Sequence, residues 1–145
     1  MEVNIFFEDV EVPGLDSEFF VLWFNKVCAQ EGKSLECVNL ILCSDDYLLD
    51  INRKHLDHDY YTDIITFDYT DGEVVSGDLF ISIDRVRENA VKEGVAFDIE
   101  LRRVMIHGIL HLLGLKDKKK DDQKLMRESE NQALMFFEGF NVPRG

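Results

Sequence analysis

Residues 98–117 read DIELRRVMIHGILHLLGLKD, a segment that combines an apolar helical pattern with two histidines. His107 and His111 are four positions apart, so an α-helix places both imidazoles on one face, one turn apart. The pattern predicts a helix over 99–113 that ends at Gly114, because glycine readily takes the positive φ that terminates helices. We expect this helix to be the central element of the fold and to carry the functional site.

Two imidazoles one turn apart can bind one metal ion, but a third ligand has to come from elsewhere. Asp117 follows three residues after Gly114, where a chain that turns back would bring its carboxylate toward His107 and His111. Three protein ligands leave a fourth position open, as in catalytic zinc sites, where bound water can reach a pKa of about 7. Taken alone, paired histidines are more often packing residues and such an aspartate a solvated charge. Both interpretations stay open on these residues alone.

Strand-like and helical patterns surround this helix on both sides. Strands are predicted over 3–8, 35–43, 62–69 and 78–83, and helices over 17–32, 45–55, 84–94, 99–113 and 121–138. The expected N-caps are Asp16 or Ser17, Ser44 or Asp45, Asp84 and Asp98. Because the two kinds of element do not alternate strictly, we predict an α+β (mixed α/β) fold. It would be a single metal-dependent hydrolase domain over 1–145, with a small mixed sheet of about four strands, about five helices and the metal site in a cleft.

Composition places the chain among ordinary globular proteins. Its 145 residues are 46% hydrophobic, which is enough for a real core, and the run over 35–43 is apolar enough for a strand buried on both faces. There is neither a secretory signal nor an apolar run of the roughly 18 residues that span a bilayer, so we expect a cytoplasmic protein with no membrane contact. The three cysteines, Cys28, Cys37 and Cys43, form no CxxC pair and are expected to be buried free thiols.

The net charge of −13 argues against a nucleic-acid partner, since phosphate binding normally needs a basic surface. One dense basic run stands against this, with lysines at 116, 118, 119 and 120 beside the proposed metal ligand. It is either a solvated link between helices or a local patch that steers phosphates. On the second interpretation Lys118, Lys119 and Lys120 would bind substrate.

Several enzyme classes lack their motifs here. Helical zinc proteases carry His-Glu-x-x-His, in which glutamate is the general base, whereas Gly108 occupies that position. The chain contains no phosphate-binding GxxxxGK[ST] loop, no GxGxxG turn and no GxSxG elbow. Protease chemistry of that kind, nucleotide hydrolysis, dinucleotide redox chemistry and serine hydrolysis therefore have no support.

The string from His107 to Gly114, HGILHLLG, resembles the signature His-Gly-x-Leu-His-Leu-x-Gly-Tyr-Asp-His of the YbeY-type rRNA-maturation endoribonucleases. All eight positions agree, and departures begin after Gly114. Leu115 and Lys116 stand where the family has tyrosine and aspartate, and Asp117 stands where it has its third histidine. The resemblance implies a site of His107, His111 and Asp117 for one Zn²⁺, although an oxygen ligand could widen the choice to another divalent metal.

The resemblance extends upstream over 52–67, where the family reads Asn…Tyr-Arg…Lys-Asp-x-Pro-Thr-Asp-Val-Leu-Ser-Phe. Matching positions are Asn52, Asp59, Thr62, Asp63 and Phe67, and Gly77-Asp78-Leu79 is similar to the family's Gly-Asp-Ile strand. Leu56 replaces an arginine that the family uses in its nuclease activity. His58 occupies the family's lysine position, and our hypothesis is that it faces the cleft as a catalytic residue. A surface histidine in a polar loop is the alternative.

The resemblance implies a zinc-dependent endoribonuclease, a hydrolase of phosphodiester bonds that acts in rRNA maturation at the small-subunit rRNA 3′ end and in ribosome quality control. Its partners would be ribosomal RNA and ribosomal or small-subunit proteins. Two alternatives stay open. One is another zinc-dependent hydrolase, and the other is a non-catalytic ribosome assembly factor with a structural metal, which Leu56 would favour.

Overall fold

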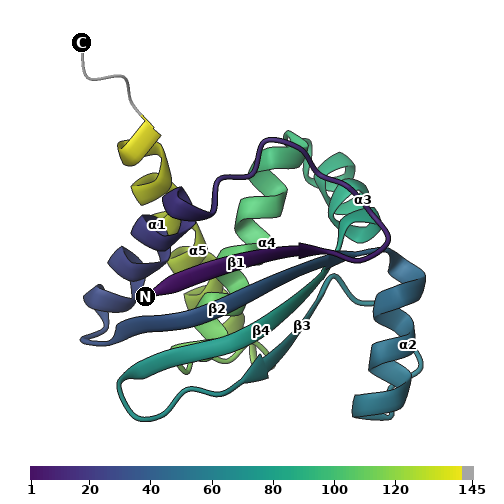
Figure 1. The fold of residues 1–145 in the computed structure, drawn as a ribbon, viewed down its shortest axis with the longest axis horizontal. Coiled ribbons are helices and arrows are strands. Elements are labelled where there is room, and N and C mark those ends of the chain that lie inside the picture. Colours follow the sequence, from purple (N-terminus) through teal and green to yellow (C-terminus); the bar gives the residue numbers. More distant parts are fainter. Residues whose placement is uncertain (142–145) are drawn as a thin grey trace.

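The β-branched and apolar runs of the sequence form the strands of one sheet, and the amphipathic segments form five helices around it (Figure 1). The computed structural model describes residues 1–141 and the side chains of residues 1–139. The elements follow the order β1 (Glu2–Phe7), α1 (Ser17–Gln30), β2 (Ser34–Cys43), α2 (Asp45–Leu56), β3 (Ile64–Asp68), β4 (Val74–Ser82), α3 (Ile83–Glu93), α4 (Phe97–Leu112) and α5 (Lys120–Asn141). The predicted α+β class is confirmed, with four strands and five helices in the described part of the chain.

The sheet is mixed. Its strand order is β1-β2-β4-β3; β1 and β4 both run parallel to β2, and β3 is antiparallel to β4. Strand β3 is consequently an edge strand, and this is the edge beside which the functional site is built. The last strand, predicted over 78–83, starts earlier than expected. Strand β4 begins at Val74, because the short turn after β3 leads directly into pairing with β2.

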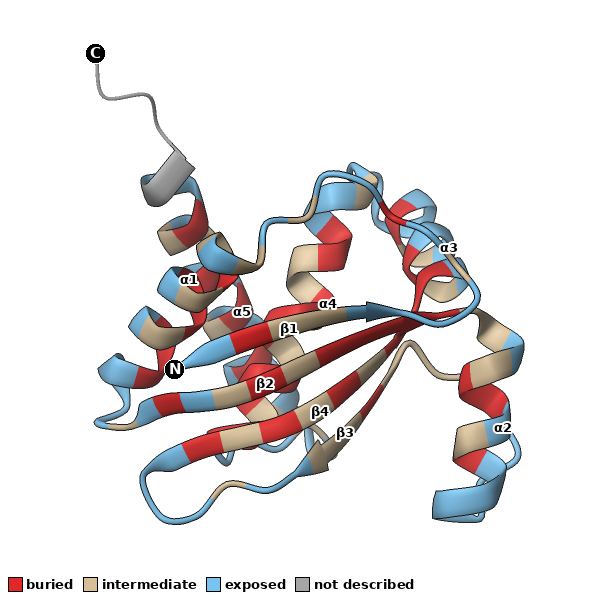
Figure 2. Ribbon diagram, in the orientation of Figure 1, coloured by how far each residue is buried: buried red, intermediate tan, exposed pale blue. Residues whose placement is uncertain are grey.

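Side-chain alternation divides β2 between two faces of the sheet, as the period of two in a strand requires. Val38, Leu40 and Leu42 are fully buried in the main core. Helices α1, α4 and α5 lie on this side of the sheet, and Figure 2 shows their buried positions turned toward it. The indole of Trp23 on α1 donates a hydrogen bond of 2.8 Å to the carbonyl of Ala133 on α5, which joins two helices of this layer.

The opposite face of the sheet is covered at one end only, by α2. There Cys43 and Ile65 pack with Leu48 of α2 in a small second cluster. The expectation that the strand over 35–43 is buried on both faces therefore holds only for its second half. Cys37 lies beyond the reach of α2 and is partly exposed, so the prediction of a buried thiol is wrong there. It is confirmed for Cys28 and Cys43, and burial raises their pKa to about 11 and about 12.

The helix ends follow the predicted capping chemistry with two exceptions. Side chains of Asp16 and Ser44 accept hydrogen bonds from the first turns of α1 and α2, as expected. Helix α3, in contrast, is capped by Ser82 rather than Asp84, because β4 runs directly into the helix. Helix α4 begins at Phe97 after Ala96, with no side-chain cap, two residues before the predicted start.

Gly108 lets α4 lie very close to the sheet. A Cβ added at this buried position would be 2.8 Å from Cδ1 of Ile64 on β3 and 2.9 Å from Cδ1 of Leu79 on β4. The position that holds glutamate in helical zinc proteases therefore faces the core, not solvent. The close approach brings the neighbouring His107 and His111 against the β3 edge, where both are partly exposed. No helix in the described part of the chain is long and apolar enough to cross a membrane.

Candidate metal centre

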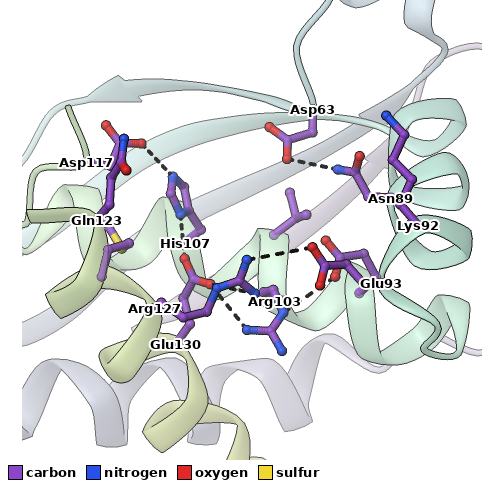
Figure 3. Close-up of a pocket in the computed structure, with 13 residues that line it drawn as sticks. Asp63, Asn89, Lys92, Glu93, Arg103, His107, Asp117, Gln123, Arg127 and Glu130 are labelled. Atoms are coloured by element: carbon purple, nitrogen blue, oxygen red, sulfur yellow. Dashed lines mark hydrogen bonds and ion pairs between the residues drawn. The ribbon is translucent and has the colours of Figure 1, made fainter. Parts of the chain in front are cut away.

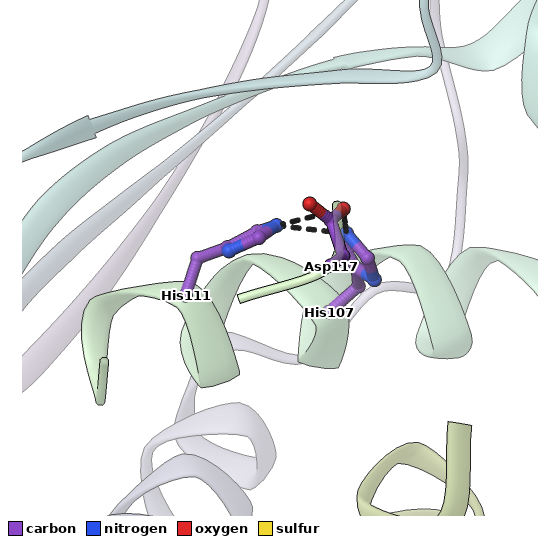
Figure 4. A group of neighbouring side chains, drawn as sticks. All are labelled: His107, His111 and Asp117. Atoms are coloured by element: carbon purple, nitrogen blue, oxygen red, sulfur yellow. Dashed lines mark hydrogen bonds and ion pairs between the residues drawn. The ribbon is translucent and has the colours of Figure 1, made fainter. Parts of the chain in front are cut away.

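The turn after α4 brings a carboxylate back over the two histidines. Gly114 has a φ of 101°, and the N–H of Leu115 donates to the carbonyl of Leu110 at 3.0 Å, which closes the helix end. The chain then reverses direction, and Asp117 lies beside the side chains of His107 and His111 (Figure 4). The geometry expected from the glycine stop is the geometry found.

Three donor atoms converge at this point (Figure 4). The Nε2 atoms of His107 and His111 are 3.0 Å apart, and Oδ2 of Asp117 is 3.2 Å from the first and 3.3 Å from the second. Zinc bonds of about 2.0–2.2 Å at tetrahedral angles would separate such atoms by about 3.3–3.6 Å. The triangle is therefore close to one face of a zinc coordination tetrahedron.

Hydrogen bonds on the far side of each ring fix which nitrogen carries a proton. Nδ1 of His111 lies 2.9 Å from the carbonyl oxygen of Leu115, which can only accept, so this nitrogen is the N–H donor. Nδ1 of His107 donates in the same way to Oε2 of Glu130 at 2.7 Å. Both Nε2 atoms are left with lone pairs that point at each other and at a carboxylate. Such an electron-rich cluster needs a cation at its centre, so the residues fit a metal ion.

The carboxylate of Glu130 is itself held in a buried network. Glu130 is 5% exposed and contacts the guanidinium of Arg103 at 3.4 Å, and Arg103 also pairs with Glu100 on its own helix. Burial disfavours the charged form of His107, but the hydrogen bond and charge of Glu130, with Asp63 and Asp117, outweigh it and raise its pKa. The surroundings therefore favour positive charge at this point, whether a proton or a metal ion supplies it.

Two hollows in the surface meet at the donor triangle. One, of about 570 Å³, lies between the loop before β3 and the end of α4 and contains all three donor residues. The other, of about 450 Å³, lies between α3, α4 and α5 and contains His107 and Asp117 (Figure 3). Asp63 lines both hollows. Both volumes are within the range of small-ligand sites, and residues of the donor triangle line both hollows.

Asp63 faces His107 across the second hollow (Figure 3). Asn89 of α3 donates to its Oδ2 at 3.3 Å. Burial raises the pKa of Asp63, although the charge of His107 and two backbone N–H groups oppose the rise. A carboxyl group whose pKa is raised beside such a donor cluster is a candidate for proton transfer.

The other predicted site residues differ in where they lie. His58 and Lys118 line the 570 Å³ hollow together with the donor triangle, and so does Leu56, which replaces the family arginine. The side chains of Lys119 and Lys120 are exposed and line neither hollow. The roles of His58 and the three lysines stay predictions.

Sequence reasoning missed Glu130, although the chain carries a signal for it. Glu130 lies at a position of α5 that otherwise faces the core, between buried Met126 and buried Ala133 and Phe137, in a helical repeat of four and three residues. A charged residue on an apolar helix face is expected to have a specific partner. Asp63 gives no comparable signal, because its neighbours Asn89 and His107 are far from it in the sequence.

Comparisons with known proteins agree on one family. The family model described as Endoribonuclease YbeY matches residues 8–138. The Endoribonuclease YbeY of Bacteroides thetaiotaomicron is 49% identical over 134 residues, which are 92% of this chain and 98% of that protein. The protein of the same name from Parabacteroides distasonis is 46% identical over 134 residues, covering 92% of this chain and 94% of that protein.

A solved structure agrees with the fold. The solution structure of a Thermotoga maritima protein aligns with a TM-score of 0.65 and 28% identity. The alignment covers 94% of this chain and 89% of the other. The arrangement of sheet and helices described above is therefore similar to one that has been determined by experiment.

Proposed function

The chain belongs to the Endoribonuclease YbeY family, and on that premise we propose that it is a zinc-dependent endoribonuclease acting in rRNA maturation and ribosome quality control. Its substrate would be ribosomal RNA, at or near the 3′ end of the small-subunit rRNA, and its partners ribosomal or small-subunit proteins. We expect it to act in the cytoplasm, where ribosomes are assembled, as one domain over residues 1–145. The main support for this function is that two histidine nitrogens and one aspartate oxygen converge in an open hollow.

His107, His111 and Asp117 would hold the ion through Nε2, Nε2 and Oδ2. The bound ion would supply Lewis-acid activation at the scissile phosphodiester. Glu130 and the Leu115 carbonyl orient the two imidazoles, and they keep each Nδ1 protonated so that Nε2 stays available. Three protein ligands beside a hollow suit a catalytic ion better than a structural one, which supports an enzyme over the assembly-factor alternative.

Proton transfer is assigned to Asp63 or His58, which both lie in the loop before β3 and line the hollow. Burial raises the pKa of Asp63, which favours the protonated form of its carboxyl group. The Nδ1 of His58 is engaged by the hydroxyl of Tyr60 at 3.0 Å, which leaves its Nε2 for substrate. Loss of RNA cleavage in His58→Ala with metal retained would support His58, and unchanged cleavage there with loss in Asp63→Asn would assign the step to Asp63.

The proposal is tested by metal content and RNA cleavage measured on the same preparations. Wild type, purified without chelator or metal-affinity tag, should hold about one ion and cut a labelled rRNA fragment internally. His111→Ala and Asp117→Ala should lose both properties. His55→Ala is the matched control, because His55 is an exposed histidine on α2 that lines neither hollow beside the ion.

Two results would contradict the proposal. Metal-loaded wild type that leaves RNA intact but hydrolyses a small phosphoester or a peptide would point to the other zinc-dependent hydrolase. A wild-type protein that binds no metal after zinc is supplied would leave the histidines as packing residues and favour the assembly factor.

A further inference from the structure

Two aromatic side chains stack on each other at the wall of the larger hollow. The rings of His58 and Tyr60 have centroids 5.2 Å apart and planes inclined by 20°. Both residues line the 570 Å³ hollow with His107, His111 and Asp117. Tyr60 is nevertheless 56% exposed, so much of its ring surface is in contact with solvent and not with the core.

The backbone that carries this pair is held in place from beneath. Asn52, on α2, is 2% exposed, and its side-chain N–H donates to the carbonyl of Tyr60 at 2.9 Å. The backbone carbonyl of Asn52 accepts from the N–H of His58 at 3.0 Å. An ion pair between Arg53 and Asp59 joins the same helix to the middle of the loop. Asn52 therefore holds the backbone at both aromatic residues, and this places the exposed ring of Tyr60 beside the candidate metal centre.

We propose that Tyr60 is a substrate-binding residue that stacks against a nucleobase of the RNA next to the scissile phosphate. The inference rests on the proposed function and deepens it. An aromatic ring presents a flat apolar surface on which any base can stack. A preorganised ring loses little conformational entropy when the base binds. The hollow is large enough for a nucleotide and already contains the groups that would act on its phosphate.

The other hollow is a poorer place for a base. Its charged side chains are paired with one another, as in the contacts of Arg103 with Glu100 and Glu130 and of Arg127 with Glu93. It has no tyrosine, tryptophan or phenylalanine among its lining residues in the described part of the chain. A base that entered it would have to displace ion pairs, whereas the face of Tyr60 is already open.

The test measures binding of a short single-stranded RNA oligonucleotide that carries the fluorescent base 2-aminopurine, with zinc-loaded protein. Tyr60→Ala should raise Kd by about 5- to 150-fold, the range expected for one lost base–aromatic stack, and should abolish the fluorescence quenching that stacking causes. Tyr60→Phe should restore both, because it keeps the ring. Tyr69→Ala is the control, since Tyr69 is 60% exposed but lies outside both hollows.

An abasic nucleotide moved along the RNA distinguishes stacking from an indirect effect. At one position the abasic nucleotide should weaken RNA binding by wild type as much as Tyr60→Ala does. At that position it should not raise the Kd of Tyr60→Ala any further. Equal losses at every position in both proteins, or an unchanged Kd in Tyr60→Ala, would overturn the inference while wild-type cleavage leaves the proposed function standing. Wild type that neither binds nor cuts RNA would overturn both.

Discussion

At the scale of single residues, the candidate metal centre depends on groups outside the triangle of donor atoms. Nδ1 of His107 donates to Glu130, and Nδ1 of His111 donates to a backbone carbonyl. The carboxylate of Glu130 can be changed by substitution, whereas the backbone carbonyl of Leu115 cannot. Glu130 is therefore the residue at which the orientation of a ligand can be tested without removing the ligand.

Glu130→Gln should weaken zinc binding by about 10- to 100-fold, the usual effect of losing a carboxylate that orients a metal-bound histidine. The amide oxygen can still accept from Nδ1 of His107, so the ring stays in place while the supporting charge is lost. Competition with a chromogenic chelator measures the affinity. Glu128→Gln, at an exposed position of the same helix, should have no effect. Equal zinc affinity in wild type and Glu130→Gln would show that Glu130 serves only the fold.

At the scale of elements, the site depends on how closely α4 approaches the sheet. Gly108 lies between the two histidines, where an added Cβ would meet Leu79 of β4, and a Cβ added at Gly77 of β4 would meet Leu112 at the end of the same helix. Neither glycine has a positive φ, so backbone conformation does not require them. They are required by the space between helix and strand.

Gly77→Ala should destabilise the protein by about 1–3 kcal/mol, the usual cost of overpacking a core. The added Cβ would be 2.7 Å from the carbonyl oxygen of Phe67, a backbone atom on β3, and 2.8 Å from Cδ2 of Leu112. Gly139→Ala on α5 is the opposite case, because nothing lies within 4 Å of the added Cβ. It should stabilise the protein by up to about 1 kcal/mol through helix propensity. Urea denaturation compares the two; equal stabilities of wild type and Gly77→Ala would mean that the sheet opens to accommodate the methyl group.

At the scale of the whole molecule, an acidic protein has to bind an acidic substrate. The net charge is −13, and the described hollows contain acidic side chains such as Asp63 and Asp117 beside the cationic ones. A bound divalent ion would offset part of this charge locally. Long-range attraction can then come only from a restricted basic region, for which the lysine run before α5 is the candidate.

Reversal of the run, with Lys118, Lys119 and Lys120 each changed to Glu, should weaken RNA binding and flatten its salt dependence. Each phosphate contact on a single strand contributes about −0.7 to the slope of log K against log salt, so the slope should change by up to about 2. Lys26→Glu, on α1, which lines neither hollow, is the control for a single charge reversal away from the run. An unchanged slope would leave the run as a solvated link between α4 and α5.

The sequence by itself determined most of the elements and the residues of the candidate metal centre. Periodicity and capping residues located the strands and helices, because these signals act within a few residues of each other. The i, i+4 spacing of His107 and His111, followed by Gly114, predicted two ligands and the direction of the third, because helix geometry and the chain reversal at a glycine are local as well. The errors at the start of α4 and at the cap of α3 are of two residues each, and the start of β4 was placed four residues too late.

Only the tertiary structure decided which distant groups surround the ion. Glu130 is 23 residues from His107 in sequence, and Asp63 reaches the site from the loop before β3. The strand order β1-β2-β4-β3 makes β3 an edge, and that edge brings the loop with His58 and Tyr60 beside α4. These neighbours depend on packing between elements, whose free energy is summed over the whole core, so no short stretch of residues carries the information.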